Sequence, residues 1–504
     1  MRARLLFLLI LIVSVLSVKA QKLITYEAGM GSRDPDDQDT WILYNKVKAM
    51  HEGMVLYADS ALLNTVRNEF TAFRGIRIVL SDTTTIFGNR LYYDGNEKVA
   101  YVWVEGRDTV RLVDGKTVLK TDRLTYDRND NTGYYNSWGH TVNGKDTLDS
   151  REGLYDATSK TFIITDNVRL KDSNTLLLTD ALVYNTDSKI ASFESPTHIY
   201  SDSTHIYSER GEYDSDIDFA RSFKSSHVTS GSKSIDCDTL HYNKQFQFGQ
   251  AWGHVVMHDT VNDLTCHGGY GETDQEKRSS LVTDSALVVY VADGDSLFLH
   301  ADTIFVVNDT ANEVESIRAF YQVRLFRHDV QGACDSAFYS AQDSVVRLYK
   351  EPVVWYDSMQ VLSDTMILHL DTNGLRLAEL IGNMMALQRL DDARFNQVKG
   401  KNCIVHFLEG EPTYADVLGN AQMVYHLTET QPDSSEALVG VNVGIGSDMR
   451  VFFKDREPDR VSTYGKPDMT CYPPNKVPDD KKRLQGFDWK QSLRPRNRHQ
   501  VFPQ

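Results

Sequence analysis

The sequence predicts an all-β protein, built as an elongated stack of about twelve two-strand units. Three observations lead to this prediction: a short phrase returns at a fixed interval, its residues alternate between apolar and polar, and turn residues separate the alternating runs. A repeat architecture also accommodates 504 residues without several separate globular cores, because each unit packs only against its neighbours.

The repeat is clearest at its tyrosines. Five of them follow one another at one constant interval: Tyr126, Tyr155, Tyr184, Tyr213 and Tyr242. They lie in phrases such as TDRLTYD, TDALVYN and CDTLHYN, and a second phrase between them reads SWGHTV or AWGHVV. The period loosens but continues upstream to residue 47 and downstream to residue 426. Each unit therefore contains two short phrases separated by turns.

Both phrases predict strands. Apolar and polar residues alternate in Leu124-Thr125-Tyr126, and period two is the pattern of a half-buried strand. A unit of about 29 residues with two turns of about four residues leaves about ten residues for each strand. Turn dipeptides such as Asp114-Gly115 and Asn143-Gly144 separate the runs. No sustained helical period appears outside the amino-terminal segment.

The residues leave two topologies open, a closed β-helix and a folded-over antiparallel meander. Cys237 and Cys266 are separated by the same interval as the tyrosines, so they lie in nearly the same register of successive units. In a β-helix their Cα atoms would lie about 5 Å apart and a disulfide could form, whereas a return strand in a meander would separate them by about 10 Å. The redox state of this pair therefore reports the topology.

The two ends of the chain differ from the repeats. The first 20 residues, MRARLLFLLILIVSVLSVKA, have the basic start, apolar run and small-residue end of a secretory signal peptide. Residues 437–455 have the pattern of a closing hairpin. The tail from Tyr472 on holds eight Lys plus Arg against three Asp, which predicts an extended or disordered segment. The expected divisions are a signal peptide (1–20), an N-terminal lead-in (21–46), two β-repeat regions (47–235 and 236–430), a closing β-hairpin segment (431–470) and a basic, proline-containing, disordered tail (471–504).

Composition and motifs restrict the function. The formal charge is −16, and it falls to −19 when Arg2, Arg4 and Lys19 leave with the signal peptide. This acidity opposes a nucleic-acid partner, which needs a basic surface. The five cysteines include no CxxC pair, which excludes a disulfide scaffold and a zinc ribbon. No GxSxG, Walker or Rossmann pattern appears in a fitting context, so we expect no enzymatic activity, no cofactor and no metal.

The candidate site is the interior of the stack. Alternation directs the leucine and tyrosine of each phrase to the same side of the strand. The predicted lining residues are Leu124, Tyr126, Leu182, Tyr184, Leu240 and Tyr242. The simpler alternative is that these side chains only fill the interior, because stacked aromatic residues belong to the core more often than to a ligand site.

Aspartates recur once per unit, at Asp59, Asp122, Asp180, Asp238, Asp302, Asp335 and Asp364. Repetition argues against catalysis, because an active site needs one constellation of carboxylates with pKa values pushed apart. We interpret them as structural residues at strand starts. A calcium ladder is the alternative, although HGGYGETD at His267 only half resembles the GGxGxD nonapeptide. His140 and His254 hold equivalent positions in the two WGH phrases and are interpreted as architectural.

These phrases resemble the OstA family of periplasmic lipopolysaccharide-transport proteins, which includes LptA-like proteins. The best matches are ADSALLN, TDALVYN and CDTLHYN for the first phrase and NSWGHTV and AWGHVVM for the second, and the resemblance covers roughly residues 47–425. It implies a twisted antiparallel β-jellyroll, V-shaped in section, whose apolar interior shelters lipid A acyl chains. It also favours free thiols at Cys237 and Cys266. This chain is several times longer than the short family members.

The resemblance implies a non-enzymatic carrier or bridge in the periplasm, associated with the outer membrane. Its expected partners are lipopolysaccharide or a related envelope lipid, other envelope transport proteins that dock through exposed edge strands, and further copies of the chain stacked end to end. Two alternatives remain: a secreted structural or adhesive β-solenoid with a filled core, and a β-helix enzyme acting on polysaccharides. The enzyme would show a local carboxylate or basic cluster that interrupts the repeat.

Overall fold

The computed structural model describes residues 22–292, 294–372, 374–431 and 436–503, so the predicted signal peptide lies outside the described residues. These residues form 40 strands and four short 3-10 helices. Neighbouring strands pair antiparallel, as between β15 and β16 or between β37 and β38. The predicted all-β antiparallel fold is therefore confirmed.

The chain divides into two compact units. Unit 1 runs to Asp202 and also contains Asp214–Asp216, and unit 2 contains Ser203–Tyr213 and the chain from Ile217 on. This division lies earlier in the chain than the boundary expected between residues 235 and 236. Unit 1 contains β1 (Thr25–Glu27), β2 (Met30–Arg33), β3 (Thr40–His51), β4 (Met54–Asn64), β5 (Glu69–Val79), β6 (Thr84–Asp94), β7 (Val99–Trp103), β8 (Val110–Asp114), β9 (Thr117–Thr121), β10 (Arg123–Asp127), β11 (Thr132–Tyr135), β12 (Gly139–Asn143), β13 (Asp146–Ser150), β14 (Glu152–Asp156), β15 (Thr161–Lys171), β16 (Thr175–Asn185), β17 (Ile190–Phe193) and β18 (Thr197–Ser201).

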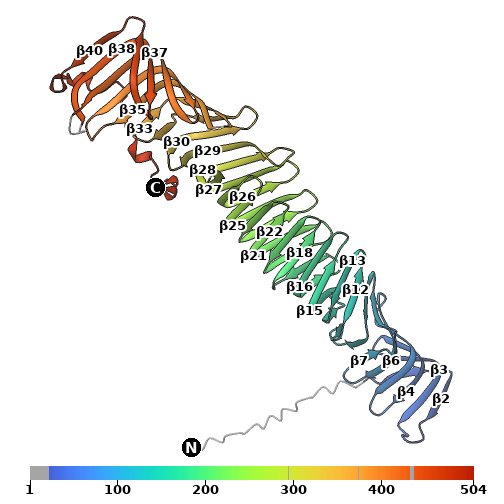
Figure 1. Ribbon diagram of the computed structural model, residues 1–504. Coiled ribbons are helices and arrows are strands. Elements are labelled where there is room, and N and C mark those ends of the chain that lie inside the picture. The colour runs from blue at the N-terminus through green and yellow to red at the C-terminus, as the bar shows by residue number, and fades with distance from the viewer. Residues whose placement is uncertain (1–21, 293, 373, 432–435, 504) are drawn as a thin grey trace, which may run out of the picture. The chain divides into compact units, whose positions relative to one another are not determined.

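Unit 2 stacks its strands in chain order, as β25 to β30 show in Figure 1. Its strands are β19 (Thr204–Ser208), β20 (Arg210–Asp214, whose last residue belongs to unit 1), β21 (Phe219–Lys224), β22 (Ser226–Ser230), β23 (Lys233–Cys237), β24 (Thr239–Asn243), β25 (Phe248–Asp259), β26 (Leu264–Asp274), β27 (Ser279–Ala292), β28 (Asp295–Asn308), β29 (Val314–Phe326), β30 (Val330–Ser340), β31 (Val345–Tyr349), β32 (Val353–Tyr356), β33 (Met359–Leu362), β34 (Thr365–Asp371), β35 (Gly374–Arg389), β36 (Phe395–Leu408), β37 (Glu411–Thr430), β38 (Glu436–Lys454), β39 (Glu457–Tyr464) and β40 (Asp468–Tyr472). The 3-10 helices follow: η1 (Pro474–Lys476), η2 (Asp479–Lys481), η3 (Gln491–Leu493) and η4 (Arg498–Val501).

The long strands bend near their middles, and elsewhere a bend separates two short strands, so that the sheet has two halves. In β15 the bend lies at Asp166 and Asn167, both left-handed with φ of 63° and 57°, where two residues stand opposite one residue of β16. Such a bulge bends a strand and increases its twist. We name the half that carries the tyrosine phrases arm A, here residues 161–165 and 181–185, and the other half arm B, here residues 168–171 and 175–178.

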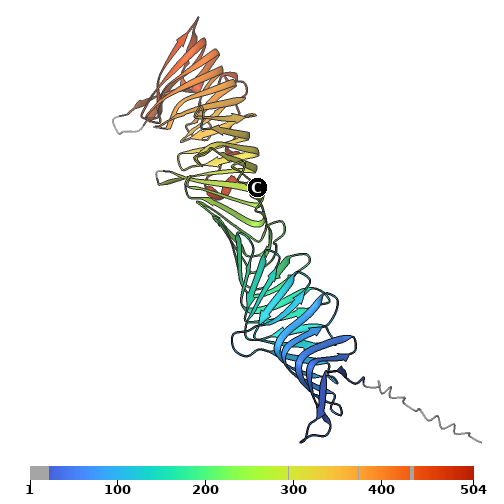
Figure 2. The ribbon, with the colours of Figure 1, turned by 90° about the vertical axis from the view of Figure 1, so that its right-hand side faces the viewer.

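The two arms pack face to face. A Cβ added to Gly133 on arm A would lie 3.2 Å from Leu112 Cδ1 on arm B. Residues alternate between buried and more exposed along both arms, for example in β8 and β10. The core of each unit therefore lies between its arms, and Figure 2 shows the succession of strands in unit 1 in blue and cyan.

The repeat period corresponds to one outward strand and one return strand. β15 and β16 have 11 residues each, close to the strand length predicted. In some repeats the bend divides the strand in two, as at Asp122, which separates β9 from β10. The meander topology is also settled: β25 pairs with both β23 and β26, so a return strand lies between Cys237 and Cys266. All five cysteines are free thiols.

The recurring aspartates lie at the bends between the arms. Asp59, Asp180, Asp302 and Asp335 are each the single residue opposite two residues of the neighbouring strand. Three glycines of the second phrase have left-handed backbone on the strand opposite these bends: Gly253, Gly382 and Gly419, with φ of 73°, 77° and 76°. These aspartates therefore have a structural place at the bends.

The two WGH phrases are not equivalent, which corrects the sequence interpretation. Gly253 and His254 form a bend, and His254 Nδ1 lies 2.8 Å from Asp238 Oδ2. His140 instead lies within β12 as a direct partner of Asp149 on β13, with 2.6 Å between their side chains. The bend before β12 falls earlier, where Ser137 donates to Asp122.

A bend glycine provides a test of this geometry. Gly382 has φ of +77°, and a Cβ added to it would lie 2.2 Å from Asp364 Oδ2. That oxygen is held in place because it accepts a hydrogen bond of 3.0 Å from Asn383 Nδ2. We expect Gly382→Ala to lower the free energy of unfolding by about 3 kcal/mol, against about 1 kcal/mol for Gly144→Ala. Gly144 also has positive φ, but its added Cβ would meet nothing within 4 Å. Urea unfolding curves measure both, and equal losses would contradict the close approach.

The carboxyl-terminal segments differ from expectation. Residues 437–455 do not form a hairpin by themselves: β38 is one strand of 19 residues that bends between the arms, and its hairpin partner is β39. Next to this bend β38 lies close to β39, because a Cβ added to Gly446 would lie 2.4 Å from Thr463 Cγ2 on β39. The tail predicted as disordered is also ordered over its described residues, with four 3-10 helices.

Candidate functional site between the two arms

All six predicted lining residues lie inside, on arm A, facing arm B. Their exposed fractions are 1% for Leu124, 2% for Tyr126, 2% for Leu182, 0% for Tyr184, 1% for Leu240 and 7% for Tyr242. The first four belong to unit 1 and the last two to unit 2. Burial raises the pKa of Tyr126 to about 12. Their inward position agrees with the alternation of the sequence, and their contact with a lipid stays a prediction.

Tyrosine hydroxyls connect arm A to arm B in unit 1. Tyr184 Oη donates to Asp146 Oδ2 at 2.7 Å and accepts a hydrogen bond of 3.2 Å from Asn143 Nδ2. Tyr155 Oη donates to Asp114 Oδ2 at 2.8 Å. Burial, and then these carboxylate partners, raise the pKa of both tyrosines. These rings therefore have fixed partners across the interior.

Ion pairs also join arm A to arm B, at the hairpin ends of the strands. Lys160 Nζ lies 2.5 Å from Asp114 Oδ2, whose carboxylate is 2% exposed, and Lys98 Nζ lies 2.6 Å from Glu52 Oε2. Burial opposes ionisation of Asp114, but hydrogen bonds from Lys160 and Tyr155 outweigh it and lower the pKa of that carboxyl. We name these cross-links the polar seam; its residues are Glu52, Lys98, Asp114, Asn143, Asp146, Tyr155, Lys160 and Tyr184. The seam closes the edge of the interior between the hairpins of unit 1.

An apolar hollow lies between the arms of unit 2, near the carboxyl-terminal strands. It has a volume of about 70 Å³. We name it the methionine hollow; its lining includes Met359, Met384, Val398, Met423, Val451 and Phe453. The first four come from arm B and the last two from arm A. Carbon atoms make up almost all of this lining, so the hollow suits a hydrocarbon rather than a polar ligand.

The few polar residues at the methionine hollow already bond to one another. Asn396 Nδ2 donates to Gln388 Oε1 at 2.9 Å, and Asn396 Oδ1 accepts from the His426 backbone at 2.8 Å. Tyr425 Oη donates to the Pro458 carbonyl at 3.2 Å. The hollow therefore offers apolar contact, and its polar neighbours are engaged with one another instead of being aimed at a head group.

Sequence reasoning missed this hollow. Its strands lack the repeated tyrosine, and phrases such as SDTMILH and LIGNMM contain methionine and smaller aliphatic residues instead. That substitution was the signal that could have found it, because replacing large rings by flexible side chains leaves irregular space in a core. The predicted site in residues 124–242 and the observed hollow in residues 359–461 are thus different parts of the chain.

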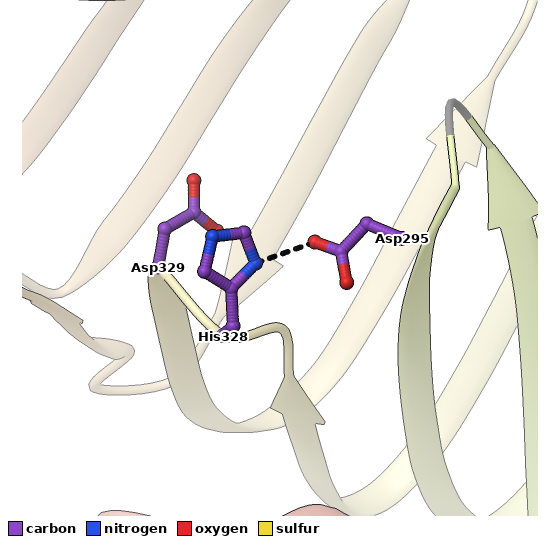
Figure 3. A group of neighbouring side chains, drawn as sticks. All are labelled: Asp295, His328 and Asp329. Atoms are coloured by element: carbon purple, nitrogen blue, oxygen red, sulfur yellow. Dashed lines mark hydrogen bonds and ion pairs between the residues drawn. The ribbon is translucent and has the colours of Figure 1, made fainter.

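One cluster has the composition of a metal site. The possible ligand atoms of Asp295, His328 and Asp329 all lie within 4.8 Å of one another (Figure 3). Their charges are already paired: His328 Nδ1 lies 2.6 Å from Asp295 Oδ2, and Arg327 Nε donates to Asp329 Oδ1 at 2.6 Å. A backbone hydrogen bond from Ser296 and then His328 lower the pKa of Asp295. This cluster is better described as an ion-pair network at hairpin ends than as a metal site.

A comparison with protein-family models agrees with the repeat phrases. A family model described as "OstA-like protein" matches residues 22–171 and 160–238. Among solved structures, LptH from Pseudomonas aeruginosa, the LptA homologous periplasmic component of the conserved lipopolysaccharide transport device, matches with 15% identity and a TM-score of 0.22, over 29% of this chain and 95% of that chain. No curated protein matches the chain.

Two further findings concern the range of the match and the membrane. The family matches stop at residue 238, whereas the repeat phrases continue to about residue 425. Among the described residues, no helix has the length and apolar character to cross a membrane. Residues 22–238 match the OstA-like family model, and the resemblance drawn from the repeat phrases is confirmed over that range.

Proposed function

We propose that this chain is a non-enzymatic periplasmic carrier that binds lipopolysaccharide through the acyl chains of lipid A and forms part of a bridge to the outer membrane. The observation that carries the proposal is an apolar interior between two arms, in a chain whose first part is OstA-like. Burial of hydrocarbon stabilises a complex by about 25 cal/mol per Å² and needs no catalytic group. An interior of this kind therefore suffices for carrying a lipid.

The methionine hollow is the part of the interior that we propose accepts acyl chains. At about 70 Å³ it is much smaller than an ordinary ligand pocket, so a fatty chain must displace side chains to enter. Met359, Met384 and Met423 are suited to this, because methionine is unbranched and adapts to irregular apolar shapes. The six predicted lining residues remain part of the proposal as further apolar residues that contact lipid: Leu124, Tyr126, Leu182, Tyr184, Leu240 and Tyr242.

Strand edges are the proposed sites for protein partners. β1 and β2 pair with β3, and β39 and β40 pair with β38. Edges of this kind add a further strand through main-chain hydrogen bonds. We propose that they bind other envelope transport proteins or further copies of the chain, after export directed by the amino-terminal signal.

A second function is favoured by the polar seam. The cross-links of Asp114 and Asp146 to tyrosines of the other arm leave unit 1 closed along its hairpins. A structural β-stack with a filled core needs such closure, whereas a lipid groove needs an entrance. Unit 1 then acts as a spacer, and lipid contact is confined to unit 2.

Photocrosslinking in cells separates these functions. A photoreactive phenylalanine analogue replaces Phe453 at the methionine hollow, Tyr184 at the polar seam, or Tyr134 as an outward control with 37% of its surface exposed. We expect lipopolysaccharide adducts at Phe453 and none at Tyr134. Adducts at Tyr184 as well would show that the seam opens and that the groove continues through unit 1. Adducts at none of the three positions would refute the carrier and leave the filled structural stack.

A further inference from the structure

The carboxyl-terminal tail lies across the outer face of arm B in unit 2, on the side away from the interior. It contacts strands in reverse order as it proceeds: Leu484 is bonded to β36, Lys490 to β33 and Arg494 to β30. Phe502 then lies 4.8 Å from the ring of His300 on β28. Figure 1 shows the carboxyl terminus in unit 2. The tail thus crosses the strands instead of pairing with one of them.

A row of residues directly opposite one another forms the surface under the tail. Gln331, Trp355, Gln360, Leu387 and Gln397 are successive cross-strand partners on β30, β32, β33, β35 and β36. We name them the docking row. Val354, Val361, Ala386 and Val398 are sequence neighbours of four of these residues and pack against the core cluster between the arms, so alternation directs the docking row to the outer face. Leu387 also borders the methionine hollow. The five residues are nevertheless 0% to 4% exposed, because the tail covers them.

Two glutamines of the docking row bind the tail backbone in the same way. Gln397 Nε2 donates to the Lys482 carbonyl at 2.8 Å, and its Oε1 accepts from the Leu484 N–H at 2.9 Å. Gln360 Nε2 donates to the Asp488 carbonyl at 2.7 Å, and its Oε1 accepts from the Lys490 N–H at 2.8 Å. Each amide therefore brackets a carbonyl and an N–H two residues apart, so these contacts are made to the backbone and not to a particular side chain.

Aromatic side chains fill the space between the brackets. The rings of Phe487 and Trp489 lie 5.1 Å and 5.2 Å from the ring of Phe395, which is on β36 beside the docking row. Farther along, Val501 is 0% exposed. Gln331 adds a side-chain contact, accepting from Arg494 Nε at 2.8 Å. Backbone brackets supply general affinity for a peptide chain, and aromatic anchors supply specificity.

The tail contacts the sheet as a bound peptide would, through side chains and without strand pairing over its described residues. A connection with Pro473, Pro474 and Pro478 joins β40 to the first bracket at Lys482. The ladder bonds of β30, β32, β33, β35 and β36 run between those strands and do not involve the tail. Departure of the tail would expose Trp355, Leu387 and Phe395 together, an apolar patch of the kind that marks an interaction surface.

We propose that the outer face of arm B around the docking row is a binding site for an aromatic-bearing peptide segment that crosses the strands, and that the chain's own tail is its occupant. The tail is a detachable ligand: it leaves and returns as a unit while the sheet beneath remains folded, and the free site accepts the same tail from a second copy. Occupation of this site does not depend on lipid binding.

The test uses a double variant of the full chain, Phe487→Ala with Trp489→Ala. Both changes lie in the tail, so they weaken its binding to the docking row and leave the residues of the sheet unchanged. Hydrogen exchange measured by mass spectrometry is expected to speed up by about tenfold or more over residues 482–502, while β32, β33 and β36 keep their protection. Leu493→Ala is the matched control, because this tail residue is 36% exposed and should leave the tail in place. Equal loss of protection in the tail and in the three strands would overturn the proposal, since the tail would then be part of the fold.

A second measurement supplies the ligand in trans. We compare two fluorescent synthetic peptides of residues 480–503, one with the natural sequence and one with alanine at positions 487 and 489. The natural peptide should bind the double-variant protein at least about tenfold more tightly than the alanine peptide does. The wild-type chain should not bind the natural peptide, because its site is occupied. Absence of binding to a variant whose tail has been released would refute the site.

Discussion

Replacing Tyr155 by alanine is expected to lower the free energy of unfolding of unit 1 by about 4 to 5 kcal/mol. The side chain is 0% exposed, and its ring stacks on Phe162 with 4.4 Å between the ring centroids. Removal of the ring leaves a cavity, and removal of the hydroxyl takes one hydrogen bond from the buried Asp114. Urea unfolding followed by circular dichroism measures the loss.

Two further variants separate the contributions to this effect. Tyr155→Phe keeps the ring and removes only the hydrogen bond, so we expect about 1 to 2 kcal/mol. Tyr134→Ala, at a 37% exposed tyrosine on the outer side of arm A, should cost below about 1 kcal/mol. A loss below about 1 kcal/mol for Tyr155→Ala would show that the ring lines open space instead of filling a core. This outcome would favour a groove through unit 1.

Replacing Lys160 by methionine is expected to destabilise the protein by about 2 to 3 kcal/mol at pH 7. The change removes the cation beside a carboxylate that is only 2% exposed, and the lysine itself is 29% exposed. The ionised Asp114 then keeps the hydrogen bond from Tyr155 but has lost its opposite charge. The loss should be measured from urea midpoints at constant ionic strength.

Acidification should reduce the difference between Lys160→Met and the wild type. The pKa of Asp114 in the folded protein lies below its ordinary value of 3.8. A lowered folded pKa contributes stability that is complete above the unfolded pKa and is lost as pH falls through the folded value. The two proteins should therefore differ most above about pH 5 and converge below pH 3.8. A constant difference from about pH 7 to about pH 3 would mean that the ion pair does not contribute.

The next repeat supplies a matched control for this ion pair. Lys189 stands one repeat interval after Lys160, and its Nζ lies 2.9 Å from Asp216 Oδ1, but this carboxylate is 64% exposed. Water screens such a pair, so Lys189→Met should cost less than about 0.5 kcal/mol. The contrast tests burial as the source of the effect, because repeat position and residue type are the same.

The bends and arms show how far local sequence could predict the fold. The alternation in TDALVYN placed Leu182 and Tyr184 on the buried face, where both are found. The constant interval between the tyrosines matched one outward and one return strand, as in β15 and β16. The two WGH phrases misled, because the same letters occupy a bend at Gly253 and a strand at His140.

The contacts that define the sites could not be predicted in the same way. Asp114 meets Tyr155 and Lys160 from 41 and 46 positions away, across two arms whose separation the sequence does not specify. Gln331 and Gln360 are separated by the same interval as the tyrosines, which was a signal of a common row. The occupant of that row is the tail. Its basic composition led to a prediction of disorder, but composition does not report the surface on which a segment packs.

The sequence by itself determined the strands, the period and the inward face of each strand, because these follow from alternation and turn chemistry within about thirty residues. Only the tertiary structure decided that the polar seam closes unit 1, that a hollow remains beside Met384, and that the tail covers the docking row. The physical reason is that alternation assigns a side chain to a face, whereas the space between two faces and the cover over an outer face depend on residues distant in the chain.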